Sequence, residues 1–166
     1  MTQLIIIRGN SGSGKSSVAK AVRELLNGRT ALIEQDYFRR HILKEGENVQ
    51  DSDIQGLLLQ SVQFAVGRKY TVVLEGILPS RKYREMFLKL THEFSYLAFY
   101  LDVSFEETLC RHETKPNCDE FGYQEMKDWY VPKDYLGVPK EIIIPEKSSL
   151  NSTVNMVVER SLYGEN

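Results

Sequence analysis

The sequence predicts an α/β fold in which a parallel sheet is covered by helices on both faces. Two observations lead to this prediction. Short apolar segments, typical of buried strands, alternate along the chain with longer segments whose apolar residues recur at helical spacing. A glycine-rich stretch also stands between the first strand-like segment and the first helical one, where such folds bind phosphate. Because each crossover helix returns the chain to the same end of the sheet, this alternation predicts parallel strands.

The first strand and the first helix enclose the glycine-rich stretch, which reads GNSGSGKS over residues 9–16. It matches the pattern G-x-x-x-x-G-K-[ST] at every fixed position. The preceding run at 4–7 is continuously apolar, as expected of a strand buried on both faces. In the following segment Val18, Val22 and Leu25 share one helical face. This strand–loop–helix context argues against a chance turn rich in glycine and serine.

We expect this loop to hold the phosphates of a nucleoside triphosphate. Glycine lets the backbone curl until successive N–H groups point into one concave nest, and the helix behind adds the positive end of its dipole. The Lys15 side chain is expected to reach the β- and γ-phosphates, and the Ser16 hydroxyl to ligate Mg²⁺. The expected nucleotide-binding residues are Gly9, Asn10, Ser11, Gly12, Ser13, Gly14, Lys15, Ser16 and Ser17.

The next elements lead to the third strand. Residues 30–34 are mostly apolar or β-branched and predict the second strand, and residues 37 to about 44 predict a short helix. A longer helix begins near Asp51, a favourable N-cap, and carries its apolar residues on one face. Residues 70–74 form a third apolar strand, which ends at Glu75.

The second half of the chain repeats the alternation. Pro79 suits the first turn of a helix, residues 96–101 predict the fourth strand, and a capping box at 104–107 opens another helix. A polar stretch follows. Residues 141–144 predict the fifth strand, and the last helix has a face made of Leu150, Val154, Val157 and Val158.

Composition and charge narrow the classes of function. The 166 residues suffice for one domain with its own core, and we predict a single domain over residues 1–166. The net charge of −2, with 23 acidic and 21 basic residues, argues against a nucleic-acid or membrane-surface partner. The two cysteines give no disulfide framework, and no apolar run has transmembrane length or the plan of a signal peptide. A cytoplasmic location is therefore expected, and the sequence carries no indication of oligomeric state.

Acidic side chains follow the second and third strands, at the edge where α/β folds bind ligands. Asp36 is followed by Arg39 and Arg40. We favour Asp36 as the base that orients an acceptor hydroxyl and accepts its proton, with an N-cap of the next helix as the alternative. Glu75 follows a strand that lacks the usual magnesium-binding aspartate. Three roles stay open for it: to support the metal without ligating it directly, to bind the acceptor's hydroxyls, or only to precede the next helix without a role in the site. The expected acceptor-binding residues are Asp36, Arg39, Arg40 and Glu75.

Cations gather again in the segment at about 109–132. Arg111 and Lys115 are four residues apart, and they share one face if the helix continues through both. A segment that brings cations over a γ-phosphate neutralises transition-state charge and excludes water, as lids do. The alternative is a solvated basic helix end that favours the helix dipole. The cysteines and the histidine nearby lack a fourth ligand at the spacing of a zinc site.

The phosphate loop, Asp36 at the strand end and the Arg111/Lys115 segment together resemble small P-loop kinases of the nucleoside monophosphate kinase-like fold. Among these the chain is similar to kinases that act on hydroxyls: polynucleotide 5′-hydroxyl kinase, chloramphenicol phosphotransferase, gluconate kinase and the zeta toxins. Residues 34–40 are similar to the stretch in which an aspartate of polynucleotide kinase activates the 5′-hydroxyl. Residues 111–115 are similar to the lid arginines of these kinases, with lysine where a second arginine is usual.

This resemblance implies a three-layer sandwich with a five-stranded parallel sheet in the order 2-3-1-4-5, and a small helical lid at about 109–132. It also implies ATP and Mg²⁺ as cofactors. Adenine is then expected between the base of the lid and the turn at 145–147.

The sequence therefore predicts an ATP-dependent phosphotransferase that moves the γ-phosphate to a hydroxyl of a small-molecule acceptor. Lys15, Asp36, Arg111 and Lys115 are the expected catalytic residues. Two alternatives stay open: a polynucleotide 5′-hydroxyl kinase, and a P-loop NTPase without a small-molecule acceptor. Against the NTPase, the chain has neither a guanine-reading N-K-x-D stretch nor a magnesium-binding aspartate after its third strand.

Overall fold

A five-stranded sheet in the order β2-β3-β1-β4-β5 forms the centre of the molecule. The computed structural model describes residues 2–44, 50–114 and 118–164. All neighbouring strands pair in parallel, which confirms the fold class and the strand order expected from the sequence. The strands are β1 (Leu4–Gly9), β2 (Thr30–Glu34), β3 (Thr71–Gly76), β4 (Tyr96–Asp102) and β5 (Glu141–Pro145).

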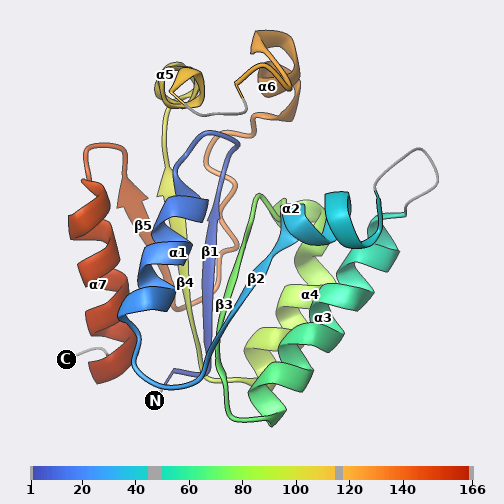
Figure 1. Ribbon diagram of the computed structural model, residues 1–166, viewed down its shortest axis with the longest axis vertical. Helices are drawn as coiled ribbons and strands as arrows, with labels where there is room; N and C mark the ends of the chain where they lie inside the picture. The colour runs from blue at the N-terminus through green and yellow to red at the C-terminus, as the bar shows by residue number, and fades with distance from the viewer. Residues whose placement is uncertain (1, 45–49, 115–117, 165–166) are drawn as a thin grey trace.

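Helices cover the sheet on both faces and gather at the carboxyl ends of its strands (Figure 1). One face is covered by α1 (Lys15–Leu25) and α7 (Leu150–Tyr163), and the other by α3 (Asp51–Gly67) and α4 (Ser80–Glu93). Beyond the carboxyl ends, at the top of Figure 1, lie α5 (Phe105–Glu113) and α6 (Tyr123–Trp129). Among the helices of the described ranges, none is both long and apolar enough to cross a membrane.

The central strand β1 belongs to two hydrophobic cores at once. Its residues Ile5 and Ile7 pack with the α1 and α7 side, whereas Leu4 and Ile6 pack with the α3 and α4 side. All four side chains are completely buried. This explains the continuous apolar run in the sequence, because a strand covered on both faces has no solvent-facing position. The two cores fix β1 firmly and so deliver the phosphate loop to the carboxyl edge of the sheet.

The helix after β2 begins earlier than the sequence indicated. It comprises α2 (Gln35–Tyr37) followed by the π-helical turn η1 (Phe38–Ile42), so that Asp36 lies in its first turn. The early start has a long-range cause, since the buried Gln35 side chain accepts a hydrogen bond from Leu78 N at 3.1 Å and donates one to Tyr83 Oη at 2.7 Å. The helix α6 lies within the polar stretch after α5, where the resemblance implied a small helical lid.

Candidate active site

The phosphate loop joins β1 to α1 with a left-handed backbone at two of its glycines. The φ angle is 82° at Gly12 and 96° at Gly14, a region that favours glycine. At Gly12 a Cβ atom would lie only 2.5 Å from the carbonyl oxygen of Thr108 in α5. Glycine at this position therefore permits both the curl of the loop and the close approach of α5.

Lys15 is the first residue of α1, and it lies close to two of the predicted acidic site residues. Its ammonium group donates to the carbonyl oxygen of Asn10 at 3.3 Å. Burial lowers the pKa of Lys15, while the negative charges of Glu75 and Asp36 oppose this shift. The fold thus gathers Lys15, Glu75 and Asp36 into one electrostatic environment at the carboxyl ends of β1, β2 and β3.

Glu75 lies beside Ser16 rather than at a helix approach. The Ser16 hydroxyl donates to Glu75 Oε1 at 2.9 Å, and Glu75 is 2% exposed. Its other oxygen, Oε2, is buried and has no hydrogen-bond partner among the described residues. Burial raises the pKa of Glu75, and Lys15 and the Ser16 hydrogen bond oppose that rise. A buried carboxylate with one unpaired oxygen next to a hydroxyl fits a Mg²⁺ site, because Mg²⁺ is usually held by few protein oxygens together with substrate phosphates.

Asp36 occupies the first turn of α2, and its alternative role as an N-cap is wrong. The N-cap position is taken by Glu34, and no side chain caps this helix. The Asp36 carboxylate is 63% exposed and accepts a hydrogen bond from Arg40 Nε at 3.0 Å. Since its charge reaches Lys15, Asp36 stands at the mouth of the phosphate site with an oxygen accessible to a ligand.

Arg40 connects this aspartate to the opposite wall of the site. Its guanidinium pairs with Asp36 and, through Nη1, with Glu120 Oε2 at 2.7 Å. Glu120 lies between α5 and α6, within the segment predicted as a lid, and it was not among the predicted site residues. Arg39 stands next to Arg40 on η1 and is partly buried. The helix after β2 and the segment of α5 and α6 thus face each other across the acceptor side.

Arg111 is fixed at the base of the predicted lid by three hydrogen bonds. Its Nε donates to Glu107 Oε1 at 2.7 Å, its Nη1 to Ser13 O at 2.9 Å, and its Nη2 to Glu146 O at 3.1 Å. The guanidinium therefore joins α5, the phosphate loop and the turn after β5. This turn is the one beside which adenine was expected. Lys115, the other predicted lid cation, lies outside the described residues.

A buried arginine that the sequence reasoning missed supports the same edge of the sheet. Arg8 is completely buried at the end of β1; it pairs with Asp134 Oδ2 at 2.7 Å and Glu141 Oε1 at 3.5 Å, and donates to Leu78 O. Burial lowers the pKa of Arg8, and the two carboxylates oppose the shift. A charge inside an otherwise apolar strand was the available signal, because such a charge needs buried partners.

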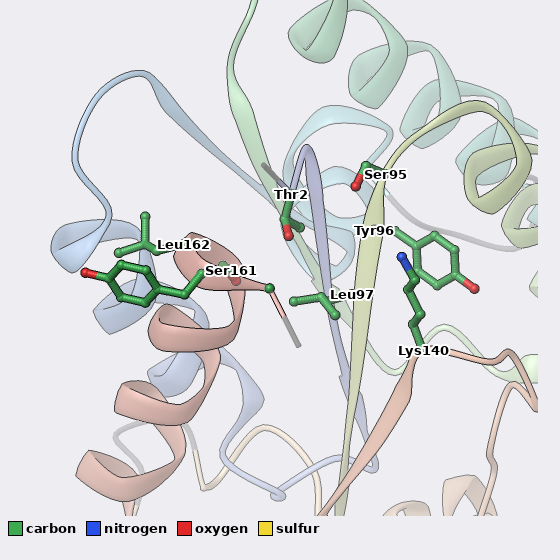
Figure 2. Close-up of a pocket in the computed structure, with 9 residues that line it drawn as sticks. Thr2, Ser95, Tyr96, Leu97, Lys140, Ser161 and Leu162 are labelled. Atoms are coloured by element: carbon green, nitrogen blue, oxygen red, sulfur yellow. The ribbon is translucent and has the colours of Figure 1, made fainter. Parts of the chain in front are cut away.

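One cavity of the molecule lies far from these residues. It has a volume of about 370 Å³ and opens at the amino ends of β1 and β4, opposite the phosphate loop (Figure 2). None of the predicted site residues lines it. Its lining consists of Thr2, Ser95, Tyr96, Leu97, Lys140, Ser161, Leu162, Tyr163 and Gly164.

Comparison with known proteins agrees with this geometry. A family model described as AAA domain matches residues 4–119 of the chain. No curated protein sequence matches the chain significantly. Several solved structures share its fold over nearly the whole chain. Three are described next, and two of them are named as kinases, in agreement with the expected fold.

The first is the APS kinase CysC of Mycobacterium tuberculosis in complex with AMPPNP and APS, with a TM-score of 0.75 and 16% identity, covering 95% of this chain and 96% of that one. The tunicamycin resistance protein of Deinococcus radiodurans has a TM-score of 0.70 and 17% identity, covering 96% and 95%. A gluconokinase from Sinorhizobium meliloti 1021 has a TM-score of 0.63 and 19% identity, covering 97% and 92%.

Proposed function

The chain belongs to the family described as AAA domain and has the fold of P-loop kinases, and from this premise we propose that it is an ATP-dependent phosphotransferase. Its acceptor is a hydroxyl group of a small molecule. The observation that carries this proposal is the convergence of Lys15, Ser16, Glu75 and Asp36 at one edge of the sheet. Phosphoryl transfer requires a phosphate clamp, a metal site and a group that receives the acceptor's proton, and these residues supply all three.

Nucleotide binding is assigned to the phosphate loop and to Lys15. The loop backbone from Gly9 to Ser17 receives the phosphates, and the Lys15 ammonium moves its hydrogen bond from Asn10 O to a phosphate oxygen. The lowered pKa of Lys15 does not prevent this role, because a bound triphosphate is a stronger source of negative charge than the carboxylates that already stabilise the cation. Adenine is assigned to the space beside Arg111 and the turn of Glu146.

The metal is assigned to Ser16 and Glu75. Ser16 would ligate Mg²⁺ directly, and Glu75 would hold it or one of its waters. This role fits the buried Glu75 Oε2, which has no hydrogen-bond partner within the described part of the chain. When bound there, Mg²⁺ would supply positive charge that neutralises the phosphates. Glu75 is therefore a metal residue in this proposal rather than an acceptor-binding one.

Asp36 is proposed to be the general base. Its carboxylate orients the acceptor hydroxyl for in-line attack on the γ-phosphorus and takes the hydroxyl proton as the new phosphorus–oxygen bond forms. Arg40 holds Asp36 through its Nε and leaves the second oxygen of the carboxylate for the acceptor. Arg39 and Arg40 line the acceptor side, Arg111 orients the nucleotide, and Lys115 contributes a further cation from the lid segment.

A small acceptor is preferred to a polynucleotide because of the charges around Asp36. The Arg40 guanidinium is shared by two carboxylates, Asp36 and Glu120, so this wall of the site is neutral rather than strongly positive. A track for a phosphate backbone needs several uncompensated cations. Two of the similar solved structures are described as an APS kinase and a gluconokinase, which are also directed at small molecules.

The proposal is tested by screening acceptors. ADP release with Mg·ATP is measured against panels of nucleosides, sugars and aminoglycoside-like alcohols, together with an oligonucleotide that has a 5′-hydroxyl end. A small alcohol that stimulates ADP release supports the proposal. Stimulation by the oligonucleotide alone would favour polynucleotide kinase activity, and ADP release that no acceptor changes would favour an NTPase.

A further inference from the structure

Both ends of the lid segment, residues 109–132, are attached to the phosphate loop. At the first end, Arg111 Nη1 donates to Ser13 O at 2.9 Å. At the second end, the backbone of Val131 bonds to the side chain of Asn10. The loop that is proposed to hold the phosphates therefore also holds the two ends of the segment that is proposed to close over them.

Two hydrogen bonds join the Asn10 side chain to the Val131 backbone, and each residue donates one of them. Asn10 Nδ2 donates to Val131 O at 2.9 Å, and Val131 N donates to Asn10 Oδ1 at 3.0 Å. The same Nδ2 group lies 3.3 Å from the hydroxyl of Tyr100 in β4. The Asn10 residue is 4% exposed. A buried amide that bonds both the N–H and the C=O of one residue fixes the position and the orientation of that residue's backbone, because each bond restrains a different direction.

The backbone of Asn10 takes part in the phosphate loop itself. Its carbonyl oxygen accepts a hydrogen bond from Ser13 N at 3.1 Å and another from Lys15 Nζ at 3.3 Å. A phosphate in the loop competes with this carbonyl for the Lys15 ammonium. Asn10 thus contacts the phosphate-binding cation through its carbonyl oxygen and Val131 through its side chain.

We propose that Asn10 is a positioning residue that couples nucleotide binding to the position of the lid segment. The proposal rests on the proposed function, since it requires that the loop binds a nucleotide. Val131 lies two residues after Trp129, the last residue of α6. A shift of the Asn10 amide therefore changes the position of the chain at the end of α6, and with it the orientation of the helix. The side chain at position 10 of this loop then influences the lid and not only the phosphates.

A different role must be distinguished from this one, namely that Asn10 merely anchors the chain after α6. Other contacts anchor the same stretch without involving the phosphate loop. Tyr130 Oη donates to Val103 O at 2.9 Å, and Tyr135 Oη donates to Asp102 Oδ2 at 2.7 Å. If Asn10 is only an anchor, removing one of these contacts should have the same consequence as removing the Asn10 amide. Tyr135→Phe is therefore the matched control.

The single tryptophan of the chain reports on the lid segment. Trp129 is the last residue of α6, is 45% exposed, and its ring lies 5.1 Å from that of Phe121. The experiment measures Trp129 fluorescence and its quenching by acrylamide while a non-hydrolysable ATP analogue with Mg²⁺ is added. Binding of the analogue is measured separately by calorimetry on the same proteins. The proteins are the wild type, Asn10→Ala and Tyr135→Phe.

The coupling predicts a Trp129 response in the wild type and in Tyr135→Phe, and its loss in Asn10→Ala when each protein is measured at analogue concentrations that calorimetry shows to saturate it. A full response in Asn10→Ala, an equal loss in both variants, or no response of the wild type to bound analogue would each overturn the coupling and leave the proposed function intact. If calorimetry shows no binding to the wild type, the proposed function fails and the coupling with it. Should Asn10→Ala not fold, Asn10→Ser, whose hydroxyl is too short to bond both groups of Val131, decides by the same criteria.

Discussion

The hydroxyl of Ser16 donates a hydrogen bond to Glu75 Oε1 at 2.9 Å, which places this glutamate, near the end of the third strand, directly against the phosphate loop. This contact follows from the strand order, because β3 lies next to β1 and Glu75 pairs in register with Ile7. It joins the hydroxyl expected to ligate Mg²⁺ to a buried carboxylate whose second oxygen, Oε2, has no hydrogen-bond partner among the described residues. The first prediction tests this pair.

Glu75→Gln should increase the Mg²⁺ concentration needed for half-maximal transfer and lower activity by about 10- to 100-fold, the usual cost of removing a group that supports a metal ligand. Glutamine keeps the size of the side chain and an oxygen for the Ser16 hydroxyl. The measurement is a Mg²⁺ titration of ADP release at fixed ATP. An unchanged Mg²⁺ dependence would remove Glu75 from the metal site.

The difference in thermal stability between Glu75→Gln and the wild type should depend on pH. The pKa of Glu75 is raised in the folded protein, so its ionisation is less favourable there than in the unfolded chain. The contribution of Glu75 to stability is therefore present in full below its unfolded pKa and is lost as the pH rises through its folded pKa. Glu75→Gln avoids this loss. Without Mg²⁺, the Tm of Glu75→Gln relative to wild type should increase as the pH rises above 4.5, the ordinary pKa of a glutamate, and a constant difference would contradict the shift.

Asp36→Asn should lower the rate of transfer by about 10²–10⁴-fold, the usual effect of losing a general base, with little change in ATP affinity. The side chain is exposed and caps no helix, so the Tm should stay close to that of the wild type. Asp53→Asn, an exposed aspartate in the first turn of α3, is the control. A fall in Tm with normal turnover would assign Asp36 a structural role instead.

Arg111→Ala should raise the KM for ATP by about tenfold or more, since hydrogen bonds to charged groups contribute about 1.5–3 kcal/mol. The reason is that Arg111 joins the phosphate loop to the turn of Glu146, beside which the nucleotide is proposed to bind. Arg111→Lys keeps the charge but cannot make both contacts, so we expect an intermediate effect. Lys127→Ala, which removes an exposed cation from α6, is the control and should change neither the KM for ATP nor kcat. A fall in kcat with an unchanged KM would indicate that Arg111 stabilises the transition state instead of binding the nucleotide.

Oligonucleotide binding should be weak and should depend little on salt. A protein that tracks a phosphate backbone with several cations loses roughly 10³-fold or more in affinity between low and moderate salt. The Arg40 pairs with Asp36 and Glu120 leave no such track on this wall of the site. The measurement is fluorescence anisotropy of a labelled oligonucleotide across a salt series. Tight binding with a steep slope would support the polynucleotide alternative.

The strands and the phosphate loop could be predicted from sequence because their signals are local. The run at 4–7 is buried on both faces, and the glycines needed for the turn follow within a few residues. The strand order came only from the resemblance, because no local pattern states which strands are neighbours. Asp36 was placed at the right edge, although the helix starts at Gln35 through contacts with residues more than forty positions away.

The remaining site contacts join distant parts of the chain, and no local pattern in the sequence indicates them. The Asn10 amide and the Val131 backbone are 121 positions apart, and Arg40 and Glu120 are 80 apart. From sequence alone, each of these residues is indistinguishable from an ordinary surface or loop residue, because its partner becomes a neighbour only in the folded chain. Arg8 is the exception, since a charge at the end of an apolar strand indicates a buried partner, but not that the partners are Asp134 and Glu141.

The central claim is that the γ-phosphate moves to an alcohol, and following the γ-phosphate tests it most directly. ATP labelled at the γ-phosphate is incubated with Mg²⁺ and the best acceptor from the screen, using wild type, Asp36→Asn and Lys15→Ala. We predict that the wild type places the label in a phosphate ester of the acceptor, that Asp36→Asn does so far more slowly, and that Lys15→Ala does not. Label found only as inorganic phosphate, at a rate that no alcohol changes, would contradict the claim.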